Sequence, residues 1–367
     1  MKKLVAIFTL IAIVFTLTAC DLPWFTNTPE VPENPENENP ETPEDPEDGG
    51  EELPEEPAEP VCDHNYVEIE RTEARPLSDG VIISECTLCK EQTTEIHTPM
   101  TRSLKLLAIG NSFSNDALGY LWDICHAAGI EDLVIGHAYI GGSYIDLHGS
   151  YFMYGNPEYT YYKYEKSAIA EKQDKVKIDV PLLDEEWDYI TLQNLSEYTD
   201  ASRFAMLDYM LGYISAKAPD AQIYWHLTWS FSEDCTYNGF ALHDYDQMKL
   251  YNAIIGVIDE LIAPREEFKG VIPAGTAMQN LRTTYIGDNV TRDGYHADLG
   301  IGRYTIGLTW YAIFTGGALD RVTWVPTNEY RTAVLTNLEA IRESVQNALD
   351  NPYEITQSKL TESPVAN

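Results

Sequence analysis

Alternating strand-like and helix-like segments constrain the fold of this chain more than any other feature of its sequence. Five short apolar runs lie at Leu104–Ile109, Leu133–Ala138, Asp188–Leu192, Gln222–Leu227 and Gly270–Pro273. Helical spacing of apolar residues is found at 116–128, about 202–216, about 244–261, 300–314 and 328–348. Such alternation predicts a parallel sheet with helices on both faces. We therefore expect an α/β fold, a three-layer α/β/α sandwich with a mainly parallel five-stranded sheet.

The first of these runs ends just before a candidate nucleophile, Ser112, in the segment LKLLAIGNSFSNDAL. Ligands of parallel sheets bind at the carboxyl ends of the strands, which is where Ser112 is expected. A serine hydroxyl is a weak nucleophile until a histidine takes its proton and a carboxylate orients that histidine. Asp293 and His296 are three residues apart in TRDGYHADLGIGRY, residues 291–304, so that one loop supplies both groups.

Each of these residues also has a structural interpretation. Asn111-Ser112 fits a helix cap, although Asp116 lies closer to the apolar stripe and is the better candidate for the N-cap. Asp293 precedes a glycine and fits a turn, and His296 fits the start of a helix. Structural roles are expected for His126, and for Arg292 and Arg303 at helix ends or in ion pairs. For His226 two interpretations stay open: a residue that lines the pocket, or a histidine of the core or rim.

Five sequence blocks in this order resemble the SGNH hydrolase superfamily, the GDSL-type esterases and lipases. They are GNSFSNDA (110–117), YIGGS (139–143), WDYITLQ (187–193), PAGTAMQNLR (273–282) and RDGYHADLGIGRYTIGLTW (292–310). The finer pattern resembles a bacterial subfamily known as a domain of unknown function, and it covers about Ser103 to Gly317. The resemblance implies a flavodoxin-like sheet, a serine nucleophile and no catalytic cofactor.

The resemblance also implies roles for individual residues. Ser112 is the nucleophile, His296 the general base and then acid, and Asp293 the orienting carboxylate. The oxyanion hole of the superfamily uses the N–H of the serine, here Ser112, a glycine N–H, here Gly142, and an asparagine side chain. The third block departs from the family pattern, so that Asn194, or Gln193 before it, is expected to supply this last donor.

A small module is expected at 61–99, before the main domain. Cys62-Asp-His64 and Cys86-Thr-Leu-Cys89 supply three thiols and an imidazole in the spacing of a tetrahedral zinc site. The segment resembles a short zinc-ribbon-like repeat, and His97 is a spare candidate ligand. The alternative is a disulfide, because exported chains meet oxidising conditions. Either site would be structural.

The N-terminus resembles a bacterial lipoprotein signal. Lys2 and Lys3 precede an apolar run that ends in Leu-Thr-Ala-Cys20, which predicts a signal peptide at 1–19 and lipidation of Cys20. The alternative is a plain signal peptide with an incidental cysteine. Residues 28–60 contain 14 acidic residues, 9 prolines and no Lys or Arg, which predicts an extended linker at 20–60. We expect a bacterial surface protein held on the outer face of a membrane.

The expected hydrolase domain spans 103–350, followed by a tail at 351–367. A net charge of −35 argues against nucleic acid as a partner. The run YFMYGNPEYTYYKY at 151–164 offers aromatic faces for sugar rings, or forms a tyrosine-rich hairpin. We expect an extracellular esterase that removes O-acetyl groups from a poly- or oligosaccharide through an acyl-Ser112 intermediate. The alternatives are a non-catalytic glycan- or cell-wall-binding lipoprotein and a lipase or thioesterase.

Overall fold

The computed structural model describes residues 62–99, 101–164 and 169–364. The predicted signal peptide, Cys20 and the acidic linker lie outside the described residues. Among the helices of the described ranges, none is both long and apolar enough to cross a membrane.

A seven-stranded sheet organises the main domain, in the order β10-β9-β8-β4-β5-β6-β7. Its strands are β4 (Ser103–Gly110), β5 (Asp132–Tyr139), β6 (Tyr159–Tyr164), β7 (Ile169–Val176), β8 (Tyr189–Leu192), β9 (Gln222–His226) and β10 (Phe268–Ile272). The five strands β10, β9, β8, β4 and β5 run parallel to one another. These are the five strands that the sequence predicted.

The expectation of a five-stranded sheet is wrong by two strands. β6 pairs antiparallel with β5, and β7 pairs antiparallel with β6. Burial alternates along β6, with Tyr159, Tyr161 and Lys163 facing inward, as expected of a strand with one covered face. The tyrosine-rich segment therefore extends the sheet, in keeping with the hairpin interpretation.

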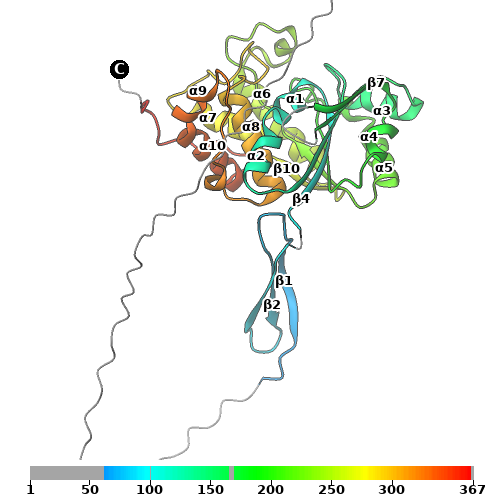
Figure 1. The fold of residues 1–367 in the computed structure, drawn as a ribbon, viewed down its shortest axis with the longest axis vertical. Helices are drawn as coiled ribbons and strands as arrows, with labels where there is room; N and C mark the ends of the chain where they lie inside the picture. The colour runs from blue at the N-terminus through cyan, green and yellow to red at the C-terminus, as the bar shows by residue number, and fades with distance from the viewer. Residues whose placement is uncertain (1–61, 100, 165–168, 365–367) are drawn as a thin grey trace, which may run out of the picture. The chain divides into compact units, whose positions relative to one another are not determined.

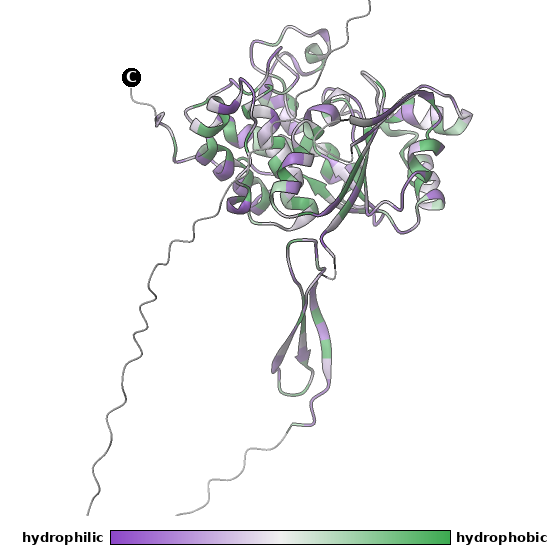
Figure 2. Cartoon of the chain, in the orientation of Figure 1, coloured by the Kyte–Doolittle hydropathy of each residue, from purple (hydrophilic) through white to green (hydrophobic). Residues whose placement is uncertain are grey.

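β4 lies in the middle of the sheet because nearly every one of its side chains is apolar. Leu104, Leu106, Leu107, Ala108 and Ile109 are at most 1% exposed. The sequence of a strand that is buried on both faces is typically such a continuous apolar run. Figure 2 shows hydrophobic residues in the sheet and in the helices around it.

Helices cover both faces of the sheet (Figure 1). On one side α8 (Ile301–Thr315) packs against α1 (Ser112–Leu118), α2 (Leu121–Ala127), α7 (Ala274–Arg282) and α10 (Leu338–Asp350). On the other side α5 (Leu207–Lys217) packs against α3 (Ile145–Tyr154) and α4 (Asp179–Leu183). The remaining α-helices are α6 (Gln247–Val257) and α9 (Arg331–Thr336). The predicted three layers are present.

The helix expected at 116–128 is two helices, α1 and α2, and it begins earlier than predicted. Asn111 is the N-cap of α1, since its side chain accepts a hydrogen bond from the Phe113 N–H. Gly119 and Tyr120 separate the two helices. Asp116, the predicted cap, is instead a buried residue inside α1.

A three-stranded antiparallel sheet precedes the main domain. It consists of β1 (Tyr66–Thr72), β2 (Gly80–Cys86) and β3 (Gln92–His97), with β2 in the middle. The loop between β1 and β2 contacts the C-terminal end of α8, where Arg75 donates to the Ile313 carbonyl and the Leu77 N–H to the Thr315 carbonyl. These backbone carbonyls of the last helical turn lack partners within the helix, so the loop satisfies them.

Candidate active site

Ser112 lies at the carboxyl end of the central strand, as the sequence predicted. β4 ends at Gly110, Asn111 caps the following helix, and Ser112 is the first residue of α1. The serine is half-buried, and its side chain faces the loop that precedes α8. This strand-to-helix turn displays the hydroxyl at the edge of the sheet where parallel α/β proteins bind ligands.

The three residues predicted as a triad meet at this edge. His296 Nε2 lies 2.8 Å from Ser112 Oγ, and His296 Nδ1 lies 2.7 Å from Asp293 Oδ2. The other oxygen of Asp293 accepts a hydrogen bond of 2.8 Å from the His296 backbone N–H. The three side chains thus form one hydrogen-bonded line from Asp293 through His296 to Ser112, the arrangement that a serine nucleophile, its base and an orienting carboxylate require.

The carboxylate of Asp293 is stabilised in its ionised form. Partial burial acts to raise the pKa of Asp293, but hydrogen bonds from the side chain and backbone of His296 outweigh it, so that the pKa is lowered. A carboxylate at this position fixes the tautomer of His296 with the proton on Nδ1. Nε2 is then free to accept the proton of Ser112 Oγ.

A buried carboxylate on α1 holds the histidine loop in place. Asp116 is fully buried and accepts hydrogen bonds from Arg292 Nη1 at 3.0 Å, from Arg303 Nε at 2.8 Å and from the Ala297 N–H at 3.1 Å. Arg292 also donates to the Ala297 carbonyl. The ion-pair roles expected for the two arginines are therefore present, whereas the central role of Asp116 was missed by the sequence analysis.

Gly142 lies in the turn after β5 and lines the same pocket as Ser112. Its φ of 63° is in the left-handed region that favours glycine. The next residue, Ser143, holds this turn in place through two contacts. Its carbonyl accepts a hydrogen bond from Asn111 Nδ2 at 2.8 Å, and its Oγ lies 2.8 Å from His148 Nε2. Burial lowers the pKa of His148 to about 3, so this ring is neutral. Neither Ser143 nor His148 was singled out by the sequence analysis, because a buried hydrogen bond leaves no periodic signal.

The two candidates for the third oxyanion donor have other partners. Gln193 donates to Asn111 Oδ1 at 2.6 Å and accepts from Ser114 Oγ at 2.5 Å. Asn194 donates to the Tyr198 carbonyl at 3.0 Å and accepts from the Ile145 N–H. Neither side chain lines the pocket at Ser112; the next residue, Leu195, does.

His226 is a core histidine. Its Nδ1 lies 3.2 Å from Gln193 Oε1, and burial lowers its pKa to about 3. It does not line the pocket at Ser112. Of the interpretations left open for this residue, the core position is the one the structure has, and pocket lining is not.

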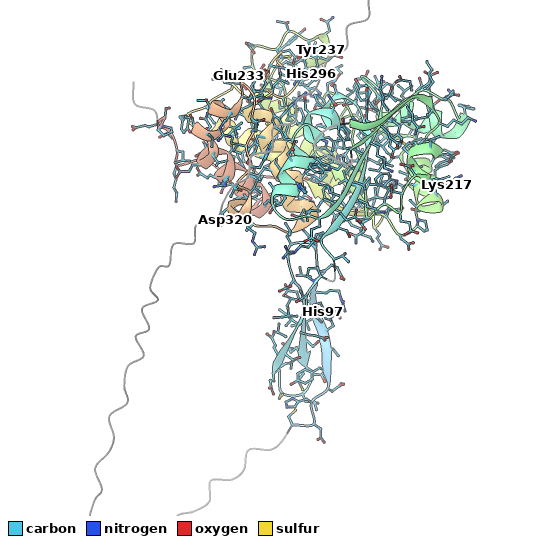
Figure 3. The ribbon with its side chains drawn as sticks, in the orientation of Figure 1. His97, Lys217, Glu233, Tyr237, His296 and Asp320 are labelled. Atoms are coloured by element: carbon cyan, nitrogen blue, oxygen red, sulfur yellow. The ribbon has the colours of Figure 1, made fainter. Side chains whose placement is uncertain are left out.

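The pocket over the triad has a volume of about 340 Å³. Figure 3 shows Tyr237 and His296, two of its lining residues, at the same end of the domain. Half of its lining residues are Phe or Tyr, namely Phe113, Tyr139, Phe231, Tyr237 and Tyr295. The tyrosines at 151–164, which the sequence analysis considered as sugar platforms, do not contribute to this wall.

A second cluster of reactive side chains lies in the three-stranded module. The ligand atoms of Cys62, His64, Cys86 and Cys89 all lie within 4.8 Å of one another. Cys62 Sγ is 3.8 Å from Cys86 Sγ, and Cys89 Sγ is 3.3 Å from His64 Nδ1. Two sulfurs held by one tetrahedral zinc at about 2.3 Å each are about 3.8 Å apart, so the four residues fit a zinc ion.

Neither the disulfide nor the spare ligand is found in the described part of the module. Its three cysteines are free thiols. His97 pairs with Gly80 at one end of β2, whereas Cys86 is at the other end. Figure 3 shows His97 within the module. It is not a member of the four-residue cluster.

Comparison with known proteins identifies relatives of the main domain. Residues 105–338 match the family model Domain of unknown function (DUF4886). The crystal structure of a DUF4886 family protein from Bacteroides uniformis is 33% identical and superposes with a TM-score of 0.65, covering 71% of this chain and 100% of that chain. No curated protein matches this sequence.

More distant similarity is found with two solved hydrolases. A putative GDSL-like lipase from Parabacteroides merdae is 13% identical with a TM-score of 0.39, covering 59% of this chain and 99% of that chain. The acetyl xylan esterase AlAXEase is 14% identical with a TM-score of 0.35, covering 57% of this chain and 99% of that chain.

Proposed function

Because the chain belongs to the DUF4886 family, which is defined without a function, we propose a function from the site itself: a serine esterase of the SGNH type. The observation that carries the proposal is the hydrogen-bonded line from Asp293 through His296 to Ser112 Oγ, with separations of 2.7 and 2.8 Å. These are the distances that a nucleophile, its base and the orienting group require.

In the proposed reaction, Ser112 Oγ attacks the ester carbonyl carbon while His296 Nε2 takes the hydroxyl proton. The N–H groups of Ser112 and Gly142 are the proposed donors to the negatively charged oxygen of the tetrahedral intermediate. When that intermediate collapses, the C–O bond to the alcohol breaks and His296 returns the proton to the departing alcohol. A water molecule, deprotonated by His296, then attacks the acyl carbon; the bond to Ser112 Oγ breaks, His296 returns the proton to Oγ, and the acid is released.

The proposed substrate is an O-acetylated carbohydrate. A pocket of about 340 Å³ is near the lower end of the range for small-molecule sites, about 300–1,000 Å³. It suits a short acyl group better than a long lipid tail. The aromatic wall offers flat apolar faces to sugar rings. The alternatives are a lipase or thioesterase and a non-catalytic glycan-binding protein.

Turnover of p-nitrophenyl acetate and p-nitrophenyl octanoate tests this function. We expect the acetyl ester to be preferred, and Ser112→Ala to abolish both turnover and labelling by a serine-directed phosphonate. Ser215→Ala, an exposed serine on α5, is the matched control and should retain activity. Circular dichroism checks that each variant is folded.

Each alternative predicts a different outcome of the same assay. A preference for octanoate would favour a lipase. Absence of both turnover and labelling in the folded wild-type protein would refute the esterase and favour a binding protein. Acetate release from acetylated xylan, mannan or peptidoglycan then identifies the class of glycan.

A structural zinc ion is proposed for the N-terminal module, held by Cys62, His64, Cys86 and Cys89. The support is the fit of the four ligand atoms to a tetrahedral site. A zinc ion with four protein ligands has no open position and supplies folding energy rather than catalysis. The proposed role is therefore to hold β1 and the turn after β2 together.

A lipid anchor at Cys20 is proposed to attach the protein to the outer face of a bacterial membrane. The support is the Leu-Thr-Ala-Cys motif and the acidic, proline-rich segment that follows it. Expression of wild type and Cys20→Ser in a bacterial host tests this proposal. Wild type should fractionate with membranes and incorporate labelled fatty acid, and the variant should do neither; equal distribution of the two proteins would refute it.

A further inference from the structure

Glu197 is a buried carboxyl in the active-site pocket that the proposed mechanism does not use. It lies in the loop after β8, is 3% exposed and lines the same pocket as Ser112 and His296. Burial of an ionised carboxyl is costly unless hydrogen-bond donors or a cation compensate it. A carboxyl in this position therefore requires an explanation.

The hydrogen bonds within the protein leave part of this carboxyl unsatisfied. Its donors are the Tyr237 hydroxyl and its own backbone N–H, whereas a carboxylate has about four acceptor sites. In the described part of the chain, Glu197 forms no ion pair, and neither Lys nor Arg lines the pocket. Desolvation accordingly raises the pKa of Glu197 above its usual value. Spare acceptor sites beside the pocket suit a ligand that brings hydrogen-bond donors.

The surroundings of Glu197 fix its position. A Cβ atom at Gly239 would lie 2.9 Å from Glu197 Oε1, so the carboxyl packs directly against that backbone. Tyr237, which donates to the carboxyl, stacks on Tyr295 with ring centroids 5.2 Å apart and an interplanar angle of 30°. Tyr295 in turn contacts His296, with ring centroids 4.2 Å apart. The acceptor is thus connected to the catalytic histidine through a pair of aromatic rings.

We propose that Glu197 is a specificity-determining residue that accepts hydrogen bonds from hydroxyl groups on the alcohol half of the ester. Together with the Tyr237–Tyr295 pair it forms a subsite for an uncharged polyol, in which a sugar ring contacts the aromatic faces and its hydroxyls reach the carboxylate. This inference rests on the proposed esterase function and specifies the substrate class of that site.

The hollow on the other side of Glu197 provides space for the rest of a larger glycan. Glu197 also lines this second hollow, of about 510 Å³, together with Tyr198, Asp200 and Arg203. Arg203 is stacked over the Tyr198 ring at 4.4 Å. An alcohol held at Glu197 therefore borders both the reacting serine and a polar surface into which further sugar units extend.

A matched substrate pair isolates the proposed hydrogen bonds. One member is a mono-O-acetylated methyl xyloside with its other hydroxyls free, and the other is its deoxy counterpart without the hydroxyl next to the ester. Hydrogen bonds to a charged group contribute about 1.5–3 kcal/mol, so we expect the wild-type kcat/KM for the hydroxylated ester to be about 10- to 100-fold higher. In Glu197→Ala the ratio of the two kcat/KM values should fall to within about threefold of one.

Glu233→Gln is the matched control, because this exposed carboxylate follows Phe231 in the same part of the chain and does not line the pocket. It should keep the wild-type ratio, which would show that the effect does not come from net charge. An unchanged ratio in folded Glu197→Ala would overturn the inference. A wild-type preference for acetylcholine that Glu197→Ala removes would also overturn it, in favour of a cation site.

Failure of the esterase proposal and failure of the role of Glu197 give different assay results. If the folded wild-type protein hydrolyses neither the sugar esters nor p-nitrophenyl acetate, the esterase proposal fails and this inference fails with it. If p-nitrophenyl acetate is turned over by wild type through Ser112 but the hydroxyl preference is absent, only the role of Glu197 is refuted.

Discussion

Asp293 performs two tasks with its two oxygens. Oδ2 holds the His296 ring at Nδ1, and Oδ1 holds the backbone N–H of the same residue. The ring and the loop that carries it are therefore oriented by one carboxylate. An asparagine at this position would keep the shape but would present either a donor or an acceptor to Nδ1, and would not stabilise the imidazolium of the proposed reaction.

The lowered pKa of Asp293 predicts a pH-dependent contribution to stability. Its folded pKa lies below the unfolded value of about 3.9, so the contribution is complete above that value and is lost as the pH falls through the folded pKa. As the pH falls below about 4, the melting temperature of wild type should therefore fall more steeply than that of Asp293→Asn. Thermal unfolding followed by circular dichroism at a series of pH values measures both slopes; parallel curves would contradict the prediction.

The three residues that meet at the site could be proposed from the sequence because they lie in distinctive local contexts, within blocks that resemble a known superfamily. Ser112 comes three residues after the apolar run that ends at Ile109, and Asp293 and His296 share one short loop. Asp116 was misassigned because its partners are remote: Arg292 is 176 residues and Arg303 is 187 residues further along the chain. From the sequence alone, an acidic residue near a helix start is interpreted as a cap. Only the folded structure shows that two arginines bind Asp116.

At the scale of elements, α1 connects Ser112, the proposed nucleophile, to the loop that carries His296, its proposed base. Ser112 begins the helix, and Asp116 lies one turn later on the same helix, where it binds Arg292, Arg303 and the Ala297 N–H. A helical turn is stiff, so the position of Asp116 relative to Ser112 is fixed. We call the contacts of Asp116 with Arg292, Arg303 and the Ala297 N–H the Asp116 clamp. The distance from Ser112 to His296 therefore depends on a contact outside the triad.

Asp116→Asn should weaken both the fold and the reaction. Removing one partner of a buried ion pair costs about 3–5 kcal/mol, and we expect about 3 kcal/mol here because the arginine side chains are 29% and 22% exposed. Urea unfolding measures this loss. Because the clamp positions His296, kcat for p-nitrophenyl acetate should fall more than KM changes. Asp220→Asn, an exposed control, should alter neither quantity; an equally stable and equally active Asp116→Asn would contradict the prediction.

The turn after β5 gives a second prediction at this scale. Gly142 has a φ of 63°, and a Cβ there would meet no atom within 4 Å, so only the backbone conformation opposes a side chain. Gly142→Ala should therefore cost only about 1 kcal/mol in stability. If its N–H is an oxyanion donor, displacement of the turn should lower kcat by up to about 10²–10³-fold. Urea unfolding and steady-state kinetics measure the two effects, and a large loss of stability with normal kcat would contradict the assignment.

The elements that sequence patterns predicted are those with a simple burial pattern. The five parallel strands are short apolar runs, which is the expected pattern for strands covered on both faces. α7 was not predicted as a helix from the sequence, and it is buried from Ala274 to Leu281, including its polar residues Thr276, Gln279 and Asn280. These polar groups are satisfied by specific contacts, such as Asn280 Nδ2 with the Ser344 carbonyl. Only the folded structure supplies such partners.

At the scale of the whole molecule, the candidate zinc cluster and the candidate active site belong to separate sheets. Cys86 ends β2 of the three-stranded sheet, whereas Ser112 follows β4 of the seven-stranded sheet. All residues of β1 are exposed, so the module has little apolar core of its own. Small modules of this kind commonly depend on a metal ion for their stability.

Zinc removal should therefore unfold the module without changing the chemistry at Ser112. We expect about one zinc per chain by elemental analysis, release of that zinc by a chelator, and loss of hydrogen-exchange protection across β1–β3. Turnover of p-nitrophenyl acetate should be the same with and without the chelator, because Ser112, His296 and their pocket share no residue with the cluster. Cys86→Ser should bind no zinc, whereas Cys125→Ser, at a buried thiol outside the cluster, should retain it. Purified wild type without zinc but with full protection of β1–β3 would refute the metal site.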